Sequence, residues 1–221
     1  MVLSFSSGLT MIPFGPITPL IIDHFGVDNR SAGLLTSIIF LVHVVLAIPA
    51  STLVGRVPLK HMVTIGGLLG STATLTFMAH NNFALLLGMR VVYGSGFIVL
   101  FAAVAPMVMQ WFRPRELPLV NGAFIVTASA GMAGSTFVVA PLSELLGWQW
   151  AISVFGGICL IGAVLWIVFG KAFPVPVEGR SMQVISRVFS VLRSKNTLLI
   201  AAADVGPFAF VTVCLAWLPT L

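Results

Sequence analysis

The segment from Phe83 to Met109 constrains this chain more than any other part of the sequence. Arg90 is its only charged residue, and the segment is longer and more apolar than a core helix of a water-soluble protein, so it predicts a transmembrane helix. Arg90 follows Phe83 by seven residues, a depth of roughly 10 Å at the helical rise per residue. A charge at that depth normally faces a bundle interior or a water-filled cavity. A snorkelling or purely structural arginine is the alternative.

Two glycines follow Arg90 closely along the same predicted helix. Gly94 comes four residues later, on the same helical face, and Gly96 two residues after that. A glycine lets a neighbouring helix or a substrate approach the backbone. Arg90 and Gly94 together are therefore candidate residues of a transport path.

The composition of the whole chain agrees with an integral membrane protein. Hydrophobic residues make up 58% of the sequence and charged residues 8%, and the mean hydropathy is +1.10. The basic residues behind the net charge of +5 lie in short loops instead of clustering on one soluble face. The expected partner is therefore the lipid bilayer, and nucleic acid is not expected.

Cysteines and histidines give no sign of a metal, a cofactor or an enzyme site. Cys159 and Cys214 both lie inside apolar segments, so we interpret them as small core residues without a disulfide. The four histidines fall in four separate predicted elements, without the spacing of metal ligands, at positions 24, 43, 61 and 80. We expect no metal, no cofactor and no enzymatic activity.

Six apolar segments predict an all-α membrane protein with a six-helix transmembrane bundle. The predicted spans are Val2 to Ile22, Ser31 to Val54, Met62 to Ala79, Phe83 to Met109, Leu117 to Leu142, and a sixth that ends near Phe169. Pro13, Pro16 and Pro19 should bend the first span. His43 lies near the middle of the second span, where a histidine is either a packing residue or a functional one.

The composition changes after the sixth span. Apolar residues share one helical face at Met182, Ile185, Val188, Phe189 and Leu192, while Arg180 and Arg187 lie on another face. This pattern predicts an amphipathic linker helix on the membrane surface, within residues 171–196. A seventh transmembrane helix should follow in residues 197–221, and it contains Asp204.

The loop charges predict the orientation in the membrane. One side carries Arg56, Lys60, Arg113, Arg115, Lys171, Arg180, Arg187, Arg193 and Lys195, whereas the other side carries only Arg30. The basic side is cytoplasmic by the positive-inside rule, so the N-terminus and the linker should be cytoplasmic. The expected location is the plasma (inner) membrane.

With six spans, a cytoplasmic linker and a further span, the sequence resembles the N-terminal half of a major facilitator superfamily transporter. The fourth-span motif of that family, R-x-x-x-G-x-G-x-A, is matched by Arg90, Gly94 and Gly96, with Ile98 in the last position. The basic motif between spans two and three, G-x-x-x-D-R-x-G-R-R, is matched at Arg56 and Lys60. It departs from the family at Ser51, Gly55, Pro58 and Leu59, and the missing acid at Gly55 removes a charge contact of the motif.

Other family patterns are matched less well. The antiporter motif of the fifth span, G-x8-G-x3-G-P, fits Gly122 and Gly131 but fails at Ser135 and Thr136, which counts against drug–proton antiport. Short strings that begin at Ala32 and Ala216 look similar to the cyanate and nitroimidazole permease branch.

The resemblance implies a protein of two six-helix halves that rock about a central site. The chain then divides into a six-span bundle (1–170), a cytoplasmic linker (171–196) and the first helix of a missing C-terminal half (197–221). We interpret it as a fragment of such a protein. A natural half-size transporter that works as a dimer is the alternative.

The leading functional hypothesis is secondary active transport of a small solute by alternating access, with an organic or inorganic anion favoured by Arg90. In this hypothesis Arg90 is a cavity residue, His43 and Asp204 are proton or substrate groups, and Arg56 and Lys60 lie at the cytoplasmic gate. Coupling of transport to protons is part of this hypothesis. A drug–proton efflux member of the same superfamily and a non-transporting membrane scaffold are the alternatives.

Overall fold

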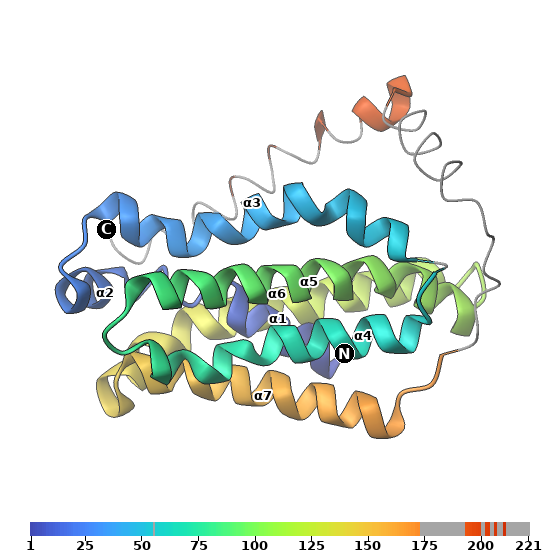
Figure 1. Ribbon diagram of the computed structural model, residues 1–221. Helices are drawn as coiled ribbons and strands as arrows, with labels where there is room; N and C mark the ends of the chain where they lie inside the picture. The colour runs from blue at the N-terminus through green and yellow to red at the C-terminus, as the bar shows by residue number, and fades with distance from the viewer. Residues whose placement is uncertain (55, 173–192, 200–201, 204–205, 207–209, 211–221) are drawn as a thin grey trace.

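Long apolar helices make up the computed structural model, which describes residues 1–54, 56–172, 193–199, 202–203, 206 and 210 (Figure 1). The helices are α1 (Val2–Met11), α2 (Thr18–Phe25), α3 (Asn29–Leu53), α4 (Leu59–Gly70), the 3-10 helix η1 (Ser71–Ala79), α5 (Phe83–Trp111), α6 (Leu117–Leu146) and α7 (Trp148–Phe169). Five helical segments are long and apolar enough to cross a membrane, with α4 and η1 counted as one. The described residues contain no β-strand, so the predicted all-α class is confirmed.

The predicted first span is two short helices instead of one bent helix. α1 ends at Met11, and α2 begins at Thr18 with Pro19 in its first turn. Pro13 and Pro16 lie between them, and a proline has no N–H to donate and clashes with the preceding turn. The prediction of a bend was therefore right in place, but the helix breaks fully.

The predicted third span changes its helical type half-way. The α-helix α4 ends at Gly70 and continues as η1. Hydroxyl groups at the junction donate to carbonyls three residues earlier, from Ser71 to Leu68 and from Thr72 to Leu69, each at 2.7 Å. Such side-chain bonds compete with the backbone for carbonyl acceptors at this junction.

Side-chain caps begin two of the long helices. Asp28 accepts a hydrogen bond from the Ser31 backbone N–H at the start of α3, and Asn82 accepts one from Leu85 at the start of α5, both at 3.0 Å. An N-cap oxygen satisfies an N–H that has no partner within the helix. The bond from Ser31 also holds the pKa of Asp28 below its usual value.

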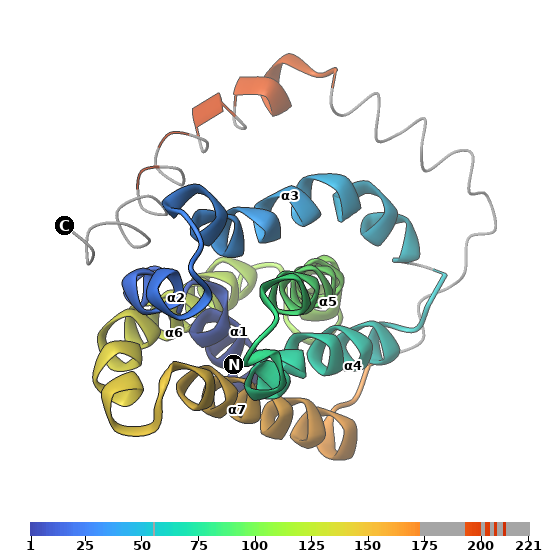
Figure 2. The ribbon, with the colours of Figure 1, turned by 60° about the vertical axis from the view of Figure 1, so that its left-hand side comes forward.

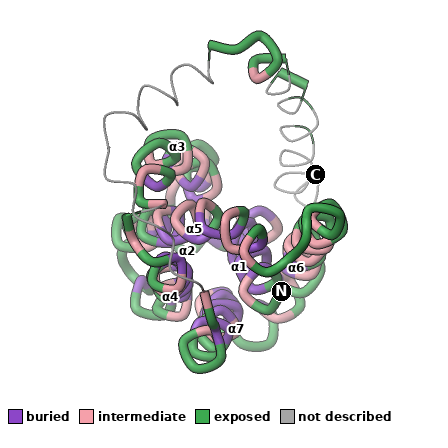
Figure 3. The backbone as a smooth tube through the Cα atoms, turned by 90° about the vertical axis from the view of Figure 1, so that its right-hand side faces the viewer, coloured by how far each residue is buried: buried purple, intermediate pink, exposed green. Residues whose placement is uncertain are grey.

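The two central helices of the bundle are α5 and α1. α5 packs between α3 and α4, and α1 packs between α6 and α7, while η1 lies against α7 (Figure 2). The burial of the helices agrees with this arrangement. α3 and α6 are mostly exposed, whereas α4 and α5 are buried on their inner faces (Figure 3). The exposed faces of α3 and α6 are apolar, as expected for contact with lipid or with another helical unit.

Glycines allow the closest helix contacts. A Cβ atom on Gly66 of α4 would lie 2.8 Å from the carbonyl oxygen of Gly96 on α5. Gly131 of α6 faces the backbone of α1 at Phe5 in the same way. Small residues at membrane helix contacts bring backbones together and increase the packing contact.

The predicted separation of charge between the two ends is present in the described part of the chain. The connections that carry Arg56, Arg113 and Lys171 all lie at one end of the bundle, on the right in Figure 1. We call this the basic end. The turns between α2 and α3, between η1 and α5, and between α6 and α7 lie at the other end.

Two of the histidines that sequence analysis treated as separate meet at that other end. His24 of α2 contacts the backbone oxygen of His80 through Nε2 at 2.5 Å, and the His80 ring contacts the Gln149 side chain at 3.0 Å. The Trp148 ring packs against His24 as well. No group of three or more potential metal ligands occurs among the described residues.

Most of the C-terminal predictions fall outside the described residues. These are the amphipathic linker helix with Arg180 and Arg187, and Asp204 in the predicted seventh span. Residues 195–199 of that region are described, and their backbone is helical.

Candidate functional site

Arg90 is buried on the inner face of α5, with 3% of its surface exposed. Its guanidinium donates three hydrogen bonds to backbone carbonyls: Nε to Leu35 at 2.9 Å, Nη1 to Thr10 at 2.8 Å and Nη2 to Met11 at 2.6 Å. Leu35 belongs to α3, and Thr10 and Met11 belong to α1. One side chain therefore ties three helices together.

The break after α1 explains why carbonyl groups are available to Arg90. Thr10 and Met11 are the last two residues of α1, and the final carbonyls of a helix lack partners within the helix. In hydrocarbon such groups need another donor. The planar guanidinium presents several N–H groups in a fixed fork and can reach two neighbouring carbonyls at once.

Aromatic rings complete the surroundings of the guanidinium. Arg90 Cζ lies 4.7 Å from the ring centre of Phe14 and 5.1 Å from that of Tyr93. The Tyr93 hydroxyl donates a 2.7 Å hydrogen bond to the carbonyl oxygen of Ser7, a second contact between α5 and α1. Ring faces attract a cation, so both aromatic residues help to stabilise the charge.

Sequence analysis did not single out Tyr93 or Phe14. Two local features of the sequence could have identified them. Tyr93 follows Arg90 by three residues and shares its helical face. Phe14 lies between the prolines that break the first span.

Gly94 allows α3 to pack directly beside Arg90. A Cβ atom at Gly94 would lie 3.3 Å from the Cβ of Val42. Sequence analysis expected either a neighbouring helix or a substrate to approach here. In this structure a helix occupies the position.

His43 lies on α3 and contacts α5 through its ring. Its ring is stacked on Phe97 with ring centres 5.0 Å apart and an interplanar angle of 19°. Its Nε2 atom is buried and has no hydrogen-bond partner among the described residues. A buried polar atom without a partner is costly, so His43 is a candidate functional residue.

His43 and Arg90 are connected through aromatic rings and are not in direct contact. Phe97 lies 6.3 Å from Tyr93 by ring centres, and Tyr93 contacts Arg90. Phe97 follows Arg90 by seven residues, about 10 Å along α5. The two predicted site residues thus lie on one continuous internal surface at different depths.

A small cavity lies beside this surface. Its volume is about 20 Å³, which suits a single water molecule and excludes a larger solute. Its lining is Ser7, Phe97, Leu100, Phe101, Phe124 and Ala128.

The predicted gate residues lie at the basic end, far along the helices from Arg90. Arg56 is exposed in the connection between α3 and α4, and Lys60 is half-buried in the first turn of α4. The backbone oxygen of Lys60 accepts a 3.3 Å hydrogen bond from the Trp166 indole. Asp204, the remaining predicted site residue, is outside the described residues.

A sequence model described as Major Facilitator Superfamily matches residues 1–221. The chain belongs to the Major Facilitator Superfamily. The buried arginine of α5 and the break between α1 and α2 are therefore features of a superfamily member. Membership does not distinguish the cyanate and nitroimidazole permease branch, so that resemblance stays a prediction.

Several curated relatives are similar to this superfamily member. An uncharacterized protein of Campylobacter jejuni is 25% identical over 208 residues, 93% of this chain and 64% of the relative. A D-galactonate transporter of Escherichia coli is 26% identical over 65% of this chain and 34% of the relative. A probable small intestine urate exporter of the mouse is 27% identical over 61% of this chain and 28% of the relative.

The chain thus spans less than two thirds of the length of each of these three relatives. Two of these relatives are named as a transporter and as a probable exporter.

Proposed function

We propose that this chain forms the N-terminal half of a secondary active transporter that moves a small organic or inorganic anion by alternating access. In this proposal α1 and α2 together make the first crossing of a six-helix half, and the five long helical segments make the other five. A second half covers the exposed faces of α3 and α6. Residues 197–221 belong to the first helix of that second half. The protein lies in the plasma (inner) membrane with its N-terminus and its basic end in the cytoplasm, and residues 171–196 form the linker between the halves.

The observation that carries the proposal is the broken helix held by Arg90. Secondary transporters place their binding sites near the middle of the bilayer, at interrupted helices whose free backbone groups face the site. Here α1 stops at Met11 and its last carbonyls bind a buried cation. Such a junction can change its partners when the halves rock, because an alternative acceptor for the guanidinium releases the α1 carbonyls.

The choice of an anion rests on Arg90 and on the names of two relatives. Galactonate and urate, the solutes in those names, are both organic anions at neutral pH. In the present conformation all three nitrogen atoms of the guanidinium bond to carbonyls. An anion would therefore bind Arg90 in a different conformation. His43 and Asp204 are the proposed proton or substrate groups, and Arg56 and Lys60 the proposed gate.

One observation favours the scaffold alternative. Arg90 pairs with helix backbone and is not in the lining of three cavities whose walls the described residues form. A purely structural arginine would look the same in a single conformation. Solute uptake therefore has to decide between the two functions.

The test is uptake by proteoliposomes that contain the product of the complete reading frame around this chain. We expect uptake of a radiolabelled sugar acid or of urate above that of empty liposomes, with a response to an imposed pH gradient. A panel of neutral sugars and cationic drugs serves as the comparison. Uptake of cationic drugs alone would favour the efflux alternative, and no uptake of any solute would favour the scaffold.

A further inference from the structure

An apolar groove lies at the basic end between the C-terminal turns of α5 and α7. Its volume is about 370 Å³, within the range of roughly 300 to 1,000 Å³ typical of small-molecule sites. Its walls include Met107, Trp111, Phe112, Trp166 and Phe169, and Lys171 is its charged residue. The groove is distinct from the candidate transport site, because Val108 on its wall follows Arg90 by eighteen residues, about 27 Å along α5.

The base of the groove is firmly held. Met107 and Trp166 pack against the buried cluster that joins α4 and α5 at Leu59 and Leu100. The Trp166 indole is fixed by its hydrogen bond to the Lys60 carbonyl oxygen. The groove is therefore a preformed feature of the bundle.

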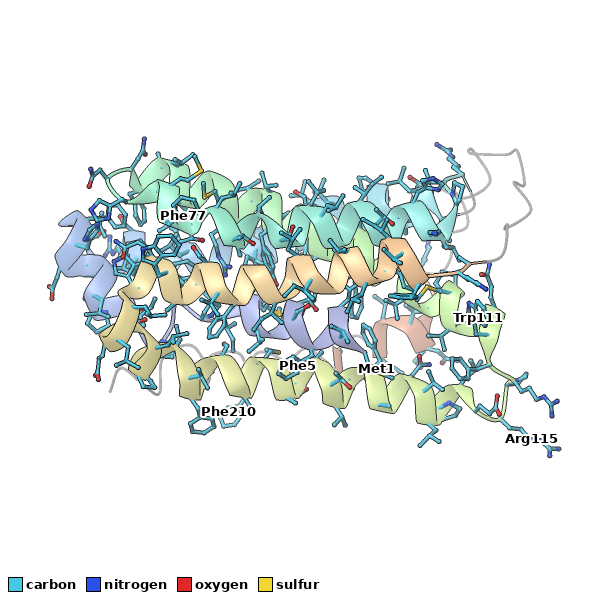
Figure 4. The ribbon with its side chains drawn as sticks, turned by 90° about the horizontal axis from the view of Figure 1, so that it is seen from below. Met1, Phe5, Phe77, Trp111, Arg115 and Phe210 are labelled. Atoms are coloured by element: carbon cyan, nitrogen blue, oxygen red, sulfur yellow. The ribbon has the colours of Figure 1, made fainter. Side chains whose placement is uncertain are left out.

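Lys171 is the cation in the lining of the groove, and two more cations follow the lining residue Phe112 along the chain. Lys171 is exposed at the end of α7, and Arg113 and Arg115 are exposed in the connection that follows Phe112. Figure 4 shows Trp111 at this end of the bundle and Arg115 pointing outward beyond it. Glu116 supplies one opposing charge, and its carboxylate accepts a 2.8 Å hydrogen bond from the Arg113 backbone N–H. None of the three cationic side chains has an ion-pair partner among the described residues.

The depth of the groove fits the boundary between lipid tails and headgroups. It lies where two membrane helices end, and tryptophan favours this level of the bilayer. Exposed apolar surface remains on its walls, with Phe169 74% and Trp111 47% exposed. An apolar surface below a cluster of cations matches a molecule with a hydrocarbon chain and a phosphate.

We propose that this groove binds one anionic phospholipid from the leaflet at the basic end. An acyl chain lies against Trp166 and Phe112, and the phosphate meets Lys171 and Arg113. Basic pockets between membrane helices bind anionic headgroups in this way. The apolar walls make the lipid, rather than free phosphate, the occupant.

Native mass spectrometry of the full chain, released from nanodiscs of equal parts phosphatidylglycerol and phosphatidylcholine, tests the proposal. We expect one phosphatidylglycerol molecule to stay bound preferentially. Lys171→Gln should weaken its retention about five-fold, the effect of one charge near a membrane surface. Arg30→Gln is the matched control, because Arg30 is an exposed cation at the opposite end of the bundle. This variant should retain phosphatidylglycerol as well as the unchanged chain does.

A second variant tests the apolar part of the site. Met107→Trp should fill the groove and reduce retention, whereas excess glycerol phosphate, which has no acyl chain, should not displace the lipid. Equal retention of phosphatidylcholine would overturn the proposal, as would an equal loss in Arg30→Gln. Retention unchanged by both Lys171→Gln and Met107→Trp would also overturn it and would favour residues 173–192 as the occupant of the groove.

Discussion

Arg90 donates a 2.6 Å hydrogen bond from Nη2 to the carbonyl oxygen of Met11, at the residue where α1 ends. The two residues are far apart in the sequence, and each meets a need of the other. The buried cation lacks a carboxylate partner among the described residues, and the broken helix has carbonyls without donors. Their contact holds an interrupted helix inside the bundle without an ion pair.

Arg90→Lys should weaken this junction although it keeps the charge. An ammonium group is a point donor and cannot reproduce a fork that reaches Leu35, Thr10 and Met11 together. The lysine would lose two of the three hydrogen bonds to a charged group. We therefore expect the free energy of unfolding to fall by about 3 kcal/mol or more. Thermal unfolding in detergent should show this loss, and uptake by the complete protein should fall strongly.

The exposed Arg30 provides the control for that substitution. Arg30→Lys should change neither the unfolding temperature nor uptake. If Arg90→Lys abolishes uptake at unchanged stability, Arg90 acts in transport alone. Unchanged uptake and unchanged stability would contradict the importance of the junction itself.

Gly96→Ala should separate α4 from α5. A Cβ atom at Gly96 would lie 2.5 Å from the Leu69 Cβ and 2.7 Å from the Gly70 backbone nitrogen, and backbone cannot move aside easily. Overpacking of this kind costs about 1 to 3 kcal/mol. Differential scanning fluorimetry in detergent measures the change.

Gly88 on the same helix is the matched control for Gly96. A Cβ atom at Gly88 meets nothing within 4 Å. Gly88→Ala should therefore be neutral or stabilise α5 by up to about 1 kcal/mol through helix propensity. Equal destabilisation by both alanines would show that close contact with α4 is not the cause.

His43→Phe separates packing from proton chemistry. The phenyl ring can keep the stack on Phe97, and the substitution removes an Nε2 atom that has no partner among the described residues. We expect stability to be equal or slightly higher. If His43 lies on the proton or substrate path, uptake falls and its response to a pH gradient disappears; uptake with an unchanged pH response would make His43 a packing residue.

Cysteine labelling tests the proposed orientation. In a cysteine-free background, single cysteines at Arg56 and Arg113 should react with a membrane-impermeant maleimide only after the cells are opened. Cysteines at His80 and Glu144 should react in intact cells. The reverse pattern would place the basic end outside and contradict the positive-inside prediction.

Helix content, the positions of the five long apolar segments and the charge difference between the two ends were predictable from local sequence. Apolar length decides whether a segment can cross a bilayer, and proline positions decide where a helix can break. A bend at the prolines of the first span and the basic end at Arg56, Arg113 and Lys171 follow from these local properties. The motif of Arg90, Gly94 and Gly96 likewise pointed to the family.

Only the tertiary structure decided which groups meet. The carbonyls of Leu35, Thr10 and Met11 became partners of Arg90 because helix packing brought α1, α3 and α5 together. Every residue carries a carbonyl, so composition and spacing cannot indicate which carbonyl a buried cation will find. The contact between His24 and His80 has the same origin, because two turns distant in the sequence pack at one end of the bundle.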